Sequence, residues 1–506
     1  MNTAAALAGV GLVTVLTLGI GAFGLRLSRT TGDFYVASRA VGAGLNASAI
    51  SGEYLSAASF LGVAGLVLSR GADMLWYPVG WTAGYLMLLL FVAAPLRRSR
   101  AYTLPDFAEL RVESRRARGV ASGLVVLIAV LYLVPQFQGA GLTLRALTGA
   151  PPWVGAALVA LVVLVNVLSG GMRSITLVQA FQYWLKLCAL LIPLMFLLVH
   201  AHGGSGATTA RLHDVAWVEP MQGPHSLYLT YSLIAATFLG TMGLPHVVVR
   251  FYTNPDGGAA RRTTVAVLVL LGLFYLLPPA YGVLGRVYVP SLIGATGADS
   301  VVLRLPAHVL GGTAGDVLTA VLGAGAFAAF LSTSSGLVVS IAGVVGQDVL
   351  GRWMPPVPAF RAAGAVGALV TLALTALSSG LAVAHAVELA FAVAASTFCP
   401  LLLLGIWWRG LTAPGAVAGM LAGGCLSASA VLATMLGSDP PGWPGALLAQ
   451  PAMCTVPVAF VTMIGVSVLT RAHLPAHLAS TMVRLHAPEA LELDRGGFVP
   501  VAERTG

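Results

Sequence analysis

Helix-disfavouring and charged residues crowd one part of an otherwise apolar stretch from Ala43 to Gly62, which reads AGLNASAISGEYLSAASFLG. Those residues are Gly44, Asn46, Ser48, Ser51, Gly52 and Glu53. Glycine lowers helix stability by about 1 kcal/mol relative to alanine, and Ser and Asn side chains compete for backbone hydrogen bonds. A carboxylate inside a membrane-spanning helix is costly enough to indicate a functional site. We therefore predict a broken helix at residues 46–53, with a ligand or ion site at the break.

Backbone that unwinds at such a break frees carbonyl oxygens, and those of Ala47 and Ile50 would flank it. A second polar run, Ser332-Thr-Ser-Ser-Gly336, lies inside another apolar segment. Adjacent hydroxyls and free carbonyls together supply the oxygen ligands that a small hard cation prefers, without a formal charge. The alternative is that Ser332 and Thr333 only bond to carbonyls of their own helix, as is common. The residues alone leave both interpretations open.

Other polar side chains in apolar segments must be paired or functional, because an unpaired buried amide is costly. Gln136 stands beside a proline in the predicted fourth helix, and Gln179 and Gln182 share one face of the sixth. Three roles are open for Glu53: contact with a substrate or proton, pairing with a distant polar group, or an outward position at a helix end. For His246, which follows a proline, a satisfied core position is favoured over a titrating one.

The composition is that of a polytopic membrane protein rather than of a soluble enzyme or a nucleic-acid-binding protein. Of 506 residues, 58% are hydrophobic and 9% are charged, whereas about a quarter are charged in soluble proteins. The net charge of +9 comes from basic residues in short loops between apolar segments, which indicates topology. The four cysteines lie far apart, and the chain has no P-loop, no GxGxxG before a helix and no HExxH motif. We therefore expect no enzymatic activity and no cofactor.

Apolar segments of about 20 residues, the length that crosses a bilayer, predict an all-α protein with thirteen transmembrane helices. Their approximate extents are 4–25, 43–68, 75–96, 119–146, 152–169, 175–200, 226–248, 264–287, 315–346, 361–378, 382–406, 413–436 and 448–470. With the N-terminus outside, 21 of the 27 Lys and Arg residues fall in cytoplasmic connections or in the tail. This bias predicts an outside N-terminus and a cytoplasmic C-terminus. Residues 1–470 would form the membrane domain, and 471–506 a loosely ordered cytoplasmic tail.

A second apolar segment is interrupted five helices after the first. Residues 237–246 read TFLGTMGLPH, with Gly240, Gly243 and Pro245 inside one predicted span. Paired interrupted segments in corresponding positions indicate an inverted repeat with the binding site at its centre. Helices 2–6 and 7–11 would form the two halves, and helix 1 and helices 12–13 would be additions.

Several motifs in this chain resemble the sodium:solute symporter family and, within it, the cation/acetate symporter branch. They are Gly32-Asp-Phe-Tyr35, Ser38-Arg39, Ser51-Gly-Glu-Tyr-Leu-Ser-Ala-Ala-Ser-Phe-Leu-Gly62, Tyr102-Thr-Leu-Pro-Asp106, Gly170-Gly-Met172, Met242-Gly-Leu-Pro-His-Val-Val-Val-Arg-Phe251 and Gln347-Asp348, where glutamine replaces the usual histidine. The resemblance covers roughly residues 30 to 410. Sugar and proline members carry a Trp-Thr-Asp triplet in the sixth helix, whereas this chain has Leu177-Val178-Gln179, as the acetate branch does.

The resemblance implies a LeuT-type inverted repeat and sodium-coupled uptake. The family's sodium ligands match Ala47, Ile50, Ala329, Ser332 and Thr333 of this chain. A carboxylate substrate would suit the free N–H groups of the half-helix that starts near Ser51. The candidate substrate ligands are Ser51, Tyr54, Gln136 and Gln179, and the candidate proton-coupling side chains are Glu53 and His246.

The sequence thus predicts a symporter of the plasma (inner) membrane that imports a short monocarboxylate such as acetate together with sodium. Its partners would be that small molecule, the sodium ion and the lipid bilayer, with no nucleic acid and no obligatory protein partner. Proton-coupled uptake and sodium-coupled transport of another small solute remain alternatives. A sensor or scaffold with a degenerate transporter fold is a further alternative, and the intact ion motif argues against it.

Overall fold

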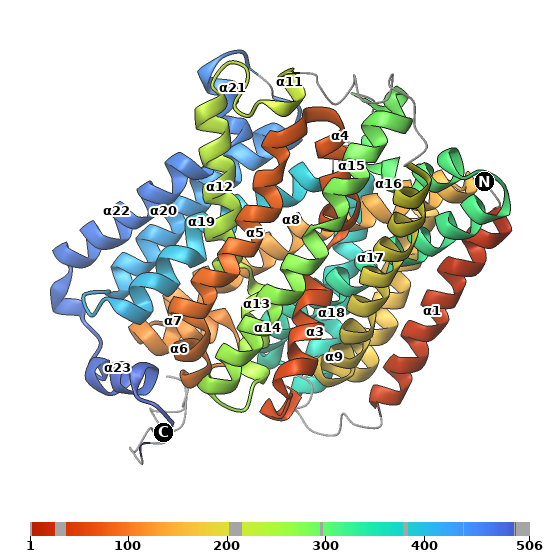
Figure 1. Ribbon diagram of the computed structural model, residues 1–506. Helices are drawn as coiled ribbons and strands as arrows, with labels where there is room; N and C mark the ends of the chain where they lie inside the picture. Colours follow the sequence, from red (N-terminus) through yellow and green to blue (C-terminus); the bar gives the residue numbers. More distant parts are fainter. Residues whose placement is uncertain are drawn as a thin grey trace.

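The computed structural model describes residues 3–25, 37–201, 215–293, 297–377, 383–438, 440–489 and 491, nearly all of them in helices (Figure 1). The prediction of an all-α membrane protein is therefore confirmed. The motif at Gly32–Tyr35, parts of two predicted outer connections (202–214 and 294–296) and the end of the tail (492–506) lie outside the described residues.

The helices follow one another with short connections. In chain order they are α1 (Thr3–Leu25), α3 (Ala43–Tyr54), α4 (Val63–Arg70), α5 (Trp76–Met87), α6 (Ala93–Arg98), α7 (Leu104–Val112), α8 (Arg115–Thr148), α9 (Pro152–Ala201), α11 (Val215–Val218), α12 (Ser226–Gly243), α13 (Pro245–Val249), α14 (Gly257–Tyr275), α15 (Leu277–Tyr288), α16 (Val301–Val309), α17 (Gly312–Asp348), α18 (Pro356–Leu377), α19 (Val383–Trp407), α20 (Ala413–Met435), α21 (Trp443–Ala449), α22 (Ala452–Leu469) and α23 (Leu478–His486). Short helical turns join some of them, notably η2 (Ala58–Gly62), η4 (Leu88–Val92), η6 (Arg250–Thr253) and η8 (Ala298–Ser300).

In the described part of the chain, eleven helical stretches are long and apolar enough to cross a membrane, and Pro152–Leu168 is a shorter apolar helix. That shorter helix is the first half of α9, which consists of two helices joined at Gly171. The φ of Gly171 is 58°, a left-handed conformation that favours glycine. The predicted count of thirteen is not confirmed, because α3 has only 12 residues and Ala58–Arg98 forms one apolar stretch of 41 residues.

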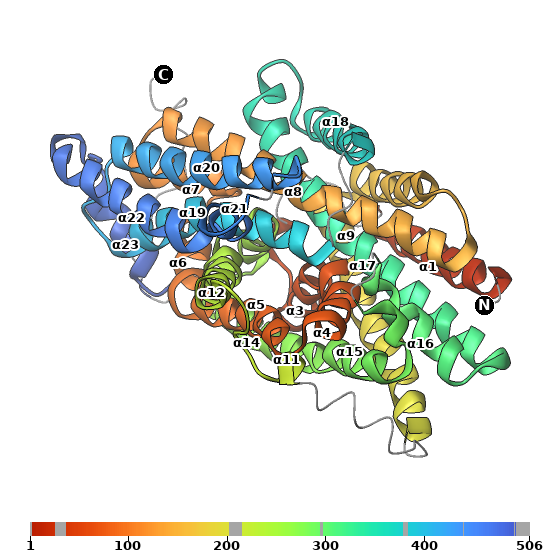
Figure 2. The same cartoon turned by 90° about the horizontal axis from the view of Figure 1, so that it is seen from above.

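Helix α17 runs through the centre of the bundle and is almost wholly buried. It packs against α9, α8, α18 and α1, while α20 and α22 lie together at the opposite side of the molecule (Figure 2). Most residues of α17 are Gly, Ala, Ser or other small side chains. Small residues let helices approach closely inside a membrane, where van der Waals packing drives association. This packing places the polar run that begins at Ser332 in the core.

The first interruption lies a few residues later than the sequence analysis predicted. Helix α3 continues to Tyr54, and the helix breaks at Leu55–Ser56, before η2. The predicted break at 46–53 was therefore wrong in position. Asn46 and Gly52, which lie in that range, connect α3 to its neighbours instead: the Asn46 amide donates to the carbonyl of Arg250 at 3.3 Å. A Cβ at Gly52 would overlap the backbone of Gln179, so this glycine allows α3 to touch α9.

The second interruption lies where the sequence placed it. Helix α12 ends at Gly243, Leu244 is extended (ψ 117°), and α13 begins at Pro245. Proline has no backbone N–H and is well suited to the first position of a helix. The two interrupted segments are therefore α3–η2–α4 and α12–α13, as an inverted repeat requires.

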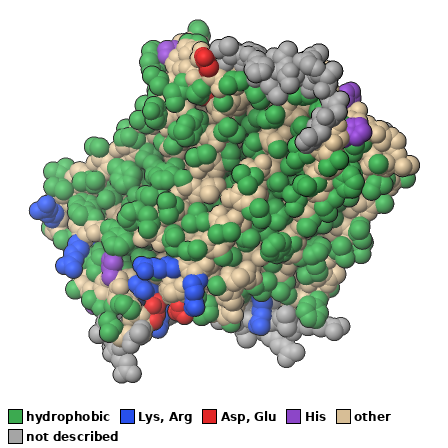
Figure 3. Space-filling model, in the orientation of Figure 1, with side chains coloured by type: hydrophobic (Ala, Val, Ile, Leu, Met, Phe, Trp, Pro, Cys, Tyr) green, Lys and Arg blue, Asp and Glu red, His purple; other side chains and the backbone are tan. Residues whose placement is uncertain are grey.

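The face of the molecule in Figure 3 is apolar over most of its height, with basic side chains toward its lower end. Figure 1 places α6, α7 and α23 at that end. Helix α23, in the predicted tail, packs against α6 and buries Leu485. Just beyond it, Glu489 forms an ion pair with Arg98 at 3.2 Å. This part of the tail is therefore attached to the membrane domain.

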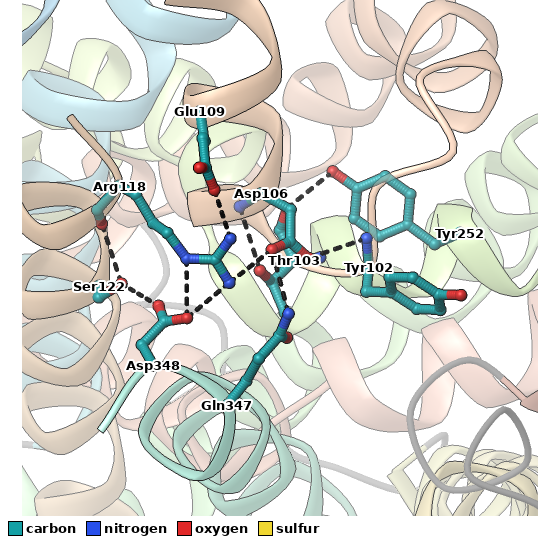
Figure 4. A network of polar contacts seen from close by, with 9 residues as sticks. All are labelled: Tyr102, Thr103, Asp106, Glu109, Arg118, Ser122, Tyr252, Gln347 and Asp348. Carbon is teal, nitrogen blue, oxygen red and sulfur yellow. Dashed lines mark hydrogen bonds and ion pairs between the residues drawn. The ribbon is translucent and has the colours of Figure 1, made fainter. Parts of the chain in front are cut away.

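A network of charged side chains joins α7, α8 and α17 at the same end (Figure 4). The Arg118 guanidinium pairs with Asp106 (2.8 Å), Glu109 (2.5 Å) and Asp348 (2.6 Å). Asp106 also accepts hydrogen bonds from the backbone N–H groups of Tyr102 and Thr103, and so caps α7. Two motifs that are far apart in the sequence, Tyr102–Asp106 and Gln347–Asp348, thus meet around one arginine.

We expect Arg118→Met to lower the melting temperature of the purified protein by several degrees, because it leaves three carboxylates without their shared cation. Breaking a buried ion pair by removal of one partner costs about 3 kcal/mol or more. Thermal unfolding in detergent measures the effect. Arg116→Met is the matched control, since Arg116 is exposed in the first turn of the same helix. Equal melting temperatures for the two variants would show that the network carries no stability.

The same variant should show a pH dependence with a defined sign. Burial raises the pKa of the Asp106 carboxyl, against the opposing effect of Arg118. A raised carboxyl pKa means that the folded state binds the proton more tightly than the unfolded chain, so stability is lost as the pH rises through that pKa. Without Arg118, which opposes the effect of burial on this pKa, the loss of stability with rising pH becomes larger. The gap in melting temperature between wild type and Arg118→Met should therefore be larger at pH 8 than at pH 5.

Candidate functional site

A lysine ammonium lies at the break between α3 and η2. Lys186, on the second half of α9, donates to the carbonyl oxygens of Gly52 and Leu55 (2.7 Å for Leu55) and to the Ser332 hydroxyl (3.0 Å). Its side chain is fully buried. The break thus brings two backbone carbonyls and one hydroxyl together around the side-chain nitrogen of Lys186.

Sequence reasoning missed Lys186, although the sequence held a signal. The other 26 basic residues are all arginine, so Lys186 is the only lysine of the chain, and it stands inside an apolar span. Arginine stays protonated in proteins, whereas a lysine can lose its proton when buried. The only lysine of the chain thus lies deep in a predicted span. This position indicates a role that a permanently protonated arginine would not fill.

Glu53 is paired with Arg250 beside this helix break. The Arg250 Nε donates to Glu53 Oε2 at 2.6 Å, its Nη1 to Thr176 Oγ1 at 2.8 Å and its Nη2 to Gln179 Oε1. Glu53 and Arg250 are both buried. Of the three roles left open for Glu53, this geometry corresponds to pairing with a distant polar group. Arg250 follows the predicted span 226–248 by two residues, and the structure buries it.

The predicted sodium ligands fall into two groups. Ser332 and Thr333 face the break, where Thr333 Oγ1 donates to the carbonyl of Glu53 at 2.6 Å and Ser332 Oγ to that of Ala329 at 3.0 Å. Ala47 and Ile50 lie within α3, where backbone carbonyls bond along the helix. The carbonyls freed by the break are those closer to Leu55. The ligand assignment of the two α3 residues stays a prediction.

Tyr54 and Gln136, the main candidates for substrate contact, border the same break. The Tyr54 hydroxyl bonds to Thr241 Oγ1 (2.8 Å) and to the carbonyl of Trp81 (3.2 Å). Gln136 Oε1 accepts from the N–H of Ala57 at 3.4 Å. Ser51 and Gln179 are the other two candidate substrate ligands. Ser51 Oγ is buried without a partner in the described residues. Gln179 forms hydrogen bonds with Arg250 and with the carbonyl of Ser332.

Aromatic side chains from several helices surround Tyr54. Its ring meets Tyr85 edge-on, with centroids 4.8 Å apart, and lies 6.3 Å from Phe391. Trp81 is 5.8 Å from the same phenylalanine, and Tyr132 is 5.9 Å from it. Sequence reasoning missed these aromatics, because their residue types are ordinary in membrane helices and only the packing brings them together.

Three buried donors of this region have no hydrogen-bond partner within the described residues: Trp81 Nε1, Tyr85 OH and Gln136 Nε2. Both ring nitrogens of His246 are also unpartnered there, and its ring packs against Tyr132 at 5.2 Å. Buried polar groups are normally paired, so these donors are exceptions within the described residues.

The amino-acid sequence is similar to those of known symporters. The profile of the sodium:solute symporter family matches residues 34–423. The chain is 32% identical over 483 residues to the uncharacterised symporter YwcA of Bacillus subtilis, covering 90% of this chain and 91% of that protein. It is 31% identical to the monocarboxylic acid transporter of Corynebacterium glutamicum, covering 86% of this chain and 87% of the relative.

Solved structures show the same fold. A Na⁺-coupled sialic acid symporter in a substrate-bound, outward-open state superposes with a TM-score of 0.71 at 16% identity, covering 91% of this chain and 97% of that one. A manganese transporter of Eremococcus coleocola gives a TM-score of 0.54 at 15% identity, covering 89% and 98%. At this identity the likeness concerns the fold alone. The fold is the predicted LeuT-type inverted repeat.

Proposed function

This chain belongs to the sodium:solute symporter family, and we propose that it imports a short monocarboxylate such as acetate, coupled to sodium, across the plasma membrane. The observation that carries the proposal is the group of oxygen atoms at the break of the second predicted helix. Two carbonyls, from Gly52 and Leu55, and the Ser332 hydroxyl converge there on the side-chain nitrogen of Lys186. Oxygen donors at an unwound helix are the means by which such transporters hold a coupling ion.

The proposed sodium ligands are the predicted set of Ala47, Ile50, Ala329, Ser332 and Thr333, extended by the carbonyls of Gly52 and Leu55. Within that set, the hydroxyls of Ser332 and Thr333 lie beside the break. The extension follows from the position of the break, which leaves the last carbonyls of α3 without regular helical partners. The proposed ligand atoms are all oxygens, which a small hard cation prefers.

The proposed substrate is an anion with a short apolar body. The unpaired donors Trp81 Nε1, Tyr85 OH and Gln136 Nε2 suit the carboxylate oxygens, and Phe391 supplies apolar surface. A relative at 31% identity is a monocarboxylic acid transporter, which supports this class of substrate. Ser51 and Gln179 are retained as more distant candidates, since Gln179 is engaged with Arg250.

The proposed orientation has the N-terminus outside and the C-terminus in the cytoplasm. The support is the band of arginine side chains at the end of the molecule that carries α6 and α23 (Figure 3), because basic residues are retained on the cytoplasmic side. The chain would act with its solute, sodium and the lipid bilayer as partners.

Proton coupling through Glu53 is the rival mechanism. Pairing of Glu53 with Arg250 at 2.6 Å favours a structural role instead. If Glu53→Gln retains full uptake, Glu53 carries no coupling proton. His246 is a second rival, and its unpartnered ring is consistent with either a substrate contact or a proton role.

Uptake of labelled acetate into proteoliposomes tests the proposal, first with an inward sodium gradient and then with only a proton gradient. We expect uptake that needs sodium. Ser332→Ala and Thr333→Ala should each weaken the apparent sodium affinity by about tenfold or more, since loss of one ligand costs about 1.4 kcal/mol or more.

Ser340→Ala is the matched control for these variants. Ser340 lies in the same helix and donates to the carbonyl of Gly336 at 3.1 Å, away from the break. The apparent sodium affinity of the Ser340→Ala variant should equal that of wild type. Uptake that follows pH and ignores sodium would overturn the choice of ion, and uptake of other solutes but not of monocarboxylates would overturn the substrate.

A further inference from the structure

A cavity lies on the membrane-facing side of the bundle, between α8, the first half of α9 and α18. We propose that this cavity binds one acyl chain of an anionic glycerophospholipid, whose phosphate lies against Arg145. Neither the substrate nor the coupling ion enters this assignment, because none of the residues that line the cavity is among their candidate ligands.

The cavity has a volume of about 380 Å³, within the range of about 300 to 1,000 Å³ that is usual for ligand pockets. Its wall is mainly apolar and comes from three helices: Phe137 and Leu142 of α8, Trp153 of α9, and Leu372 of α18. Thr375 also lines it, but its hydroxyl donates to the carbonyl of Thr371 in the same helix at 2.8 Å. Such a space suits an apolar ligand better than water, which needs polar partners.

The cavity is accessible from the lipid. Two of its lining side chains are exposed, Leu142 by 50% and Trp153 by 70%. Helix α18 lies at the edge of the bundle, beside α8 and α9 (Figure 2). Because α8 and α18 are both long and apolar enough to cross the membrane, the surface between them faces acyl chains and not water. A molecule dissolved in the bilayer can therefore enter the cavity from the side.

A basic side chain continues the lining face of α8 toward the end of the helix. Gln138, Leu142 and Arg145 follow one another at intervals of four and three residues, so they share one face of the helix. The first two line the cavity. Arg145 is exposed, and no carboxylate of the described residues pairs with it. Since α8 ends at Thr148, the guanidinium lies close to the level at which this helix leaves the membrane.

Trp153 indicates the same level from the neighbouring helix. It stands in the first turn of α9, and tryptophan is enriched where the membrane meets water. A lipid whose acyl chain occupies the cavity therefore places its phosphate beside Arg145. A basic side chain near the membrane surface attracts anionic lipids. The cavity accepts the chain of any phospholipid, and Arg145 selects those with a net negative head group.

The test uses the full-length protein, stripped of lipid in detergent and titrated with phosphatidylglycerol or with phosphatidylcholine of the same chain length. Native mass spectrometry counts the lipids bound. In wild type we expect one tightly bound lipid. Phosphatidylglycerol should bind about fivefold more tightly than phosphatidylcholine, which is the effect of one basic side chain near the membrane surface.

Replacement of the arginine tests the contact with the head group. Arg145→Gln should bind phosphatidylglycerol no more tightly than phosphatidylcholine. Arg304→Gln is the matched control, because Arg304 is exposed on α16 and does not line the cavity. This variant should keep the preference of wild type for the anionic lipid.

Filling the cavity tests the contact with the acyl chain. Ala376 lines the cavity, so Ala376→Leu occupies part of it. We expect this variant to bind both lipids about fivefold more weakly, because the chain loses apolar surface that it would bury. Ala373→Leu makes the same substitution at an exposed position of α18 that does not line the cavity. It should bind both lipids as wild type does.

Tryptophan fluorescence locates the bound lipid without disturbing its head group. Phosphatidylglycerol with brominated acyl chains, added at one lipid per protein, should quench the fluorescence of wild type by contact with Trp153. Trp153→Phe should lose this quenching. Trp184→Phe is the control, because Trp184 is exposed on the second half of α9 and does not line the cavity. Its quenching should remain.

Four outcomes would overturn the proposal. Equal affinity of wild type for the two lipids would remove the role of Arg145, and quenching that persists in Trp153→Phe would place the lipid elsewhere. Displacement of both lipids by detergent alone would show an unspecific apolar groove. A dimer that Ala376→Leu disrupts would show that a second copy of the chain covers this surface.

Discussion

Arg250→Met should abolish transport and sharply lower the yield of folded protein. The substitution leaves the Glu53 carboxylate buried without its cation, and it also removes the partner of Thr176 and Gln179. Breaking a buried ion pair from one side costs about 3 to 5 kcal/mol, most of it from the uncompensated charge. The free energy of unfolding of native proteins is only about 5 to 15 kcal/mol. Detergent melting temperature and acetate uptake measure the two effects.

Two further variants separate charge from packing at this pair. Arg262→Met makes the same substitution at an exposed arginine in the first turns of α14. It should change neither the melting temperature nor acetate uptake. Adding Glu53→Gln to Arg250→Met removes the stranded charge and should restore much of the lost stability. If Arg250→Met alone melts as wild type does, the pair is not a stabilising element.

The second large effect is expected from Gly52→Ala. A Cβ at Gly52 would overlap the backbone carbonyl of Gln179, and backbone of a packed helix cannot rotate away as a side chain can. Helices α3 and α9 must then separate, which moves the Gly52 carbonyl away from Lys186. We expect loss of sodium-dependent uptake of tenfold or more, together with a lower melting temperature, because overpacking costs about 1 to 3 kcal/mol.

Gly44→Ala is the control, because a Cβ at Gly44 meets nothing within 4 Å. Both substitutions lie in α3 and raise its intrinsic helix propensity by a similar amount. Uptake by Gly44→Ala should therefore equal that of wild type. Comparable losses in both variants would mean that backbone flexibility of α3, and not its contact with α9, explains the effect.

The sequence determined the class of protein and much of its fold. Hydropathy and length alone place most spans, because burial in lipid forces long apolar helices with satisfied backbone groups. The second interruption was located correctly, since Pro245 has no N–H to continue a helix. The family followed from motifs. The structure brings Ser332 and Thr333 close to the first break, and their role as sodium ligands stays a prediction.

Only the tertiary structure decided how the polar groups are paired. Gly52 favours a helix break by local propensity, but its contact with α9 gives it a packing role, and the break lies at Leu55–Ser56. Glu53 and Arg250 are 197 positions apart, and Lys186 and Gly52 are 134 apart. No local sequence pattern predicts such pairs, because only the folded bundle determines which partner lies close to a buried charge. The chemistry of this site is therefore a property of the packed helices, whereas the membrane-spanning character is a property of each segment.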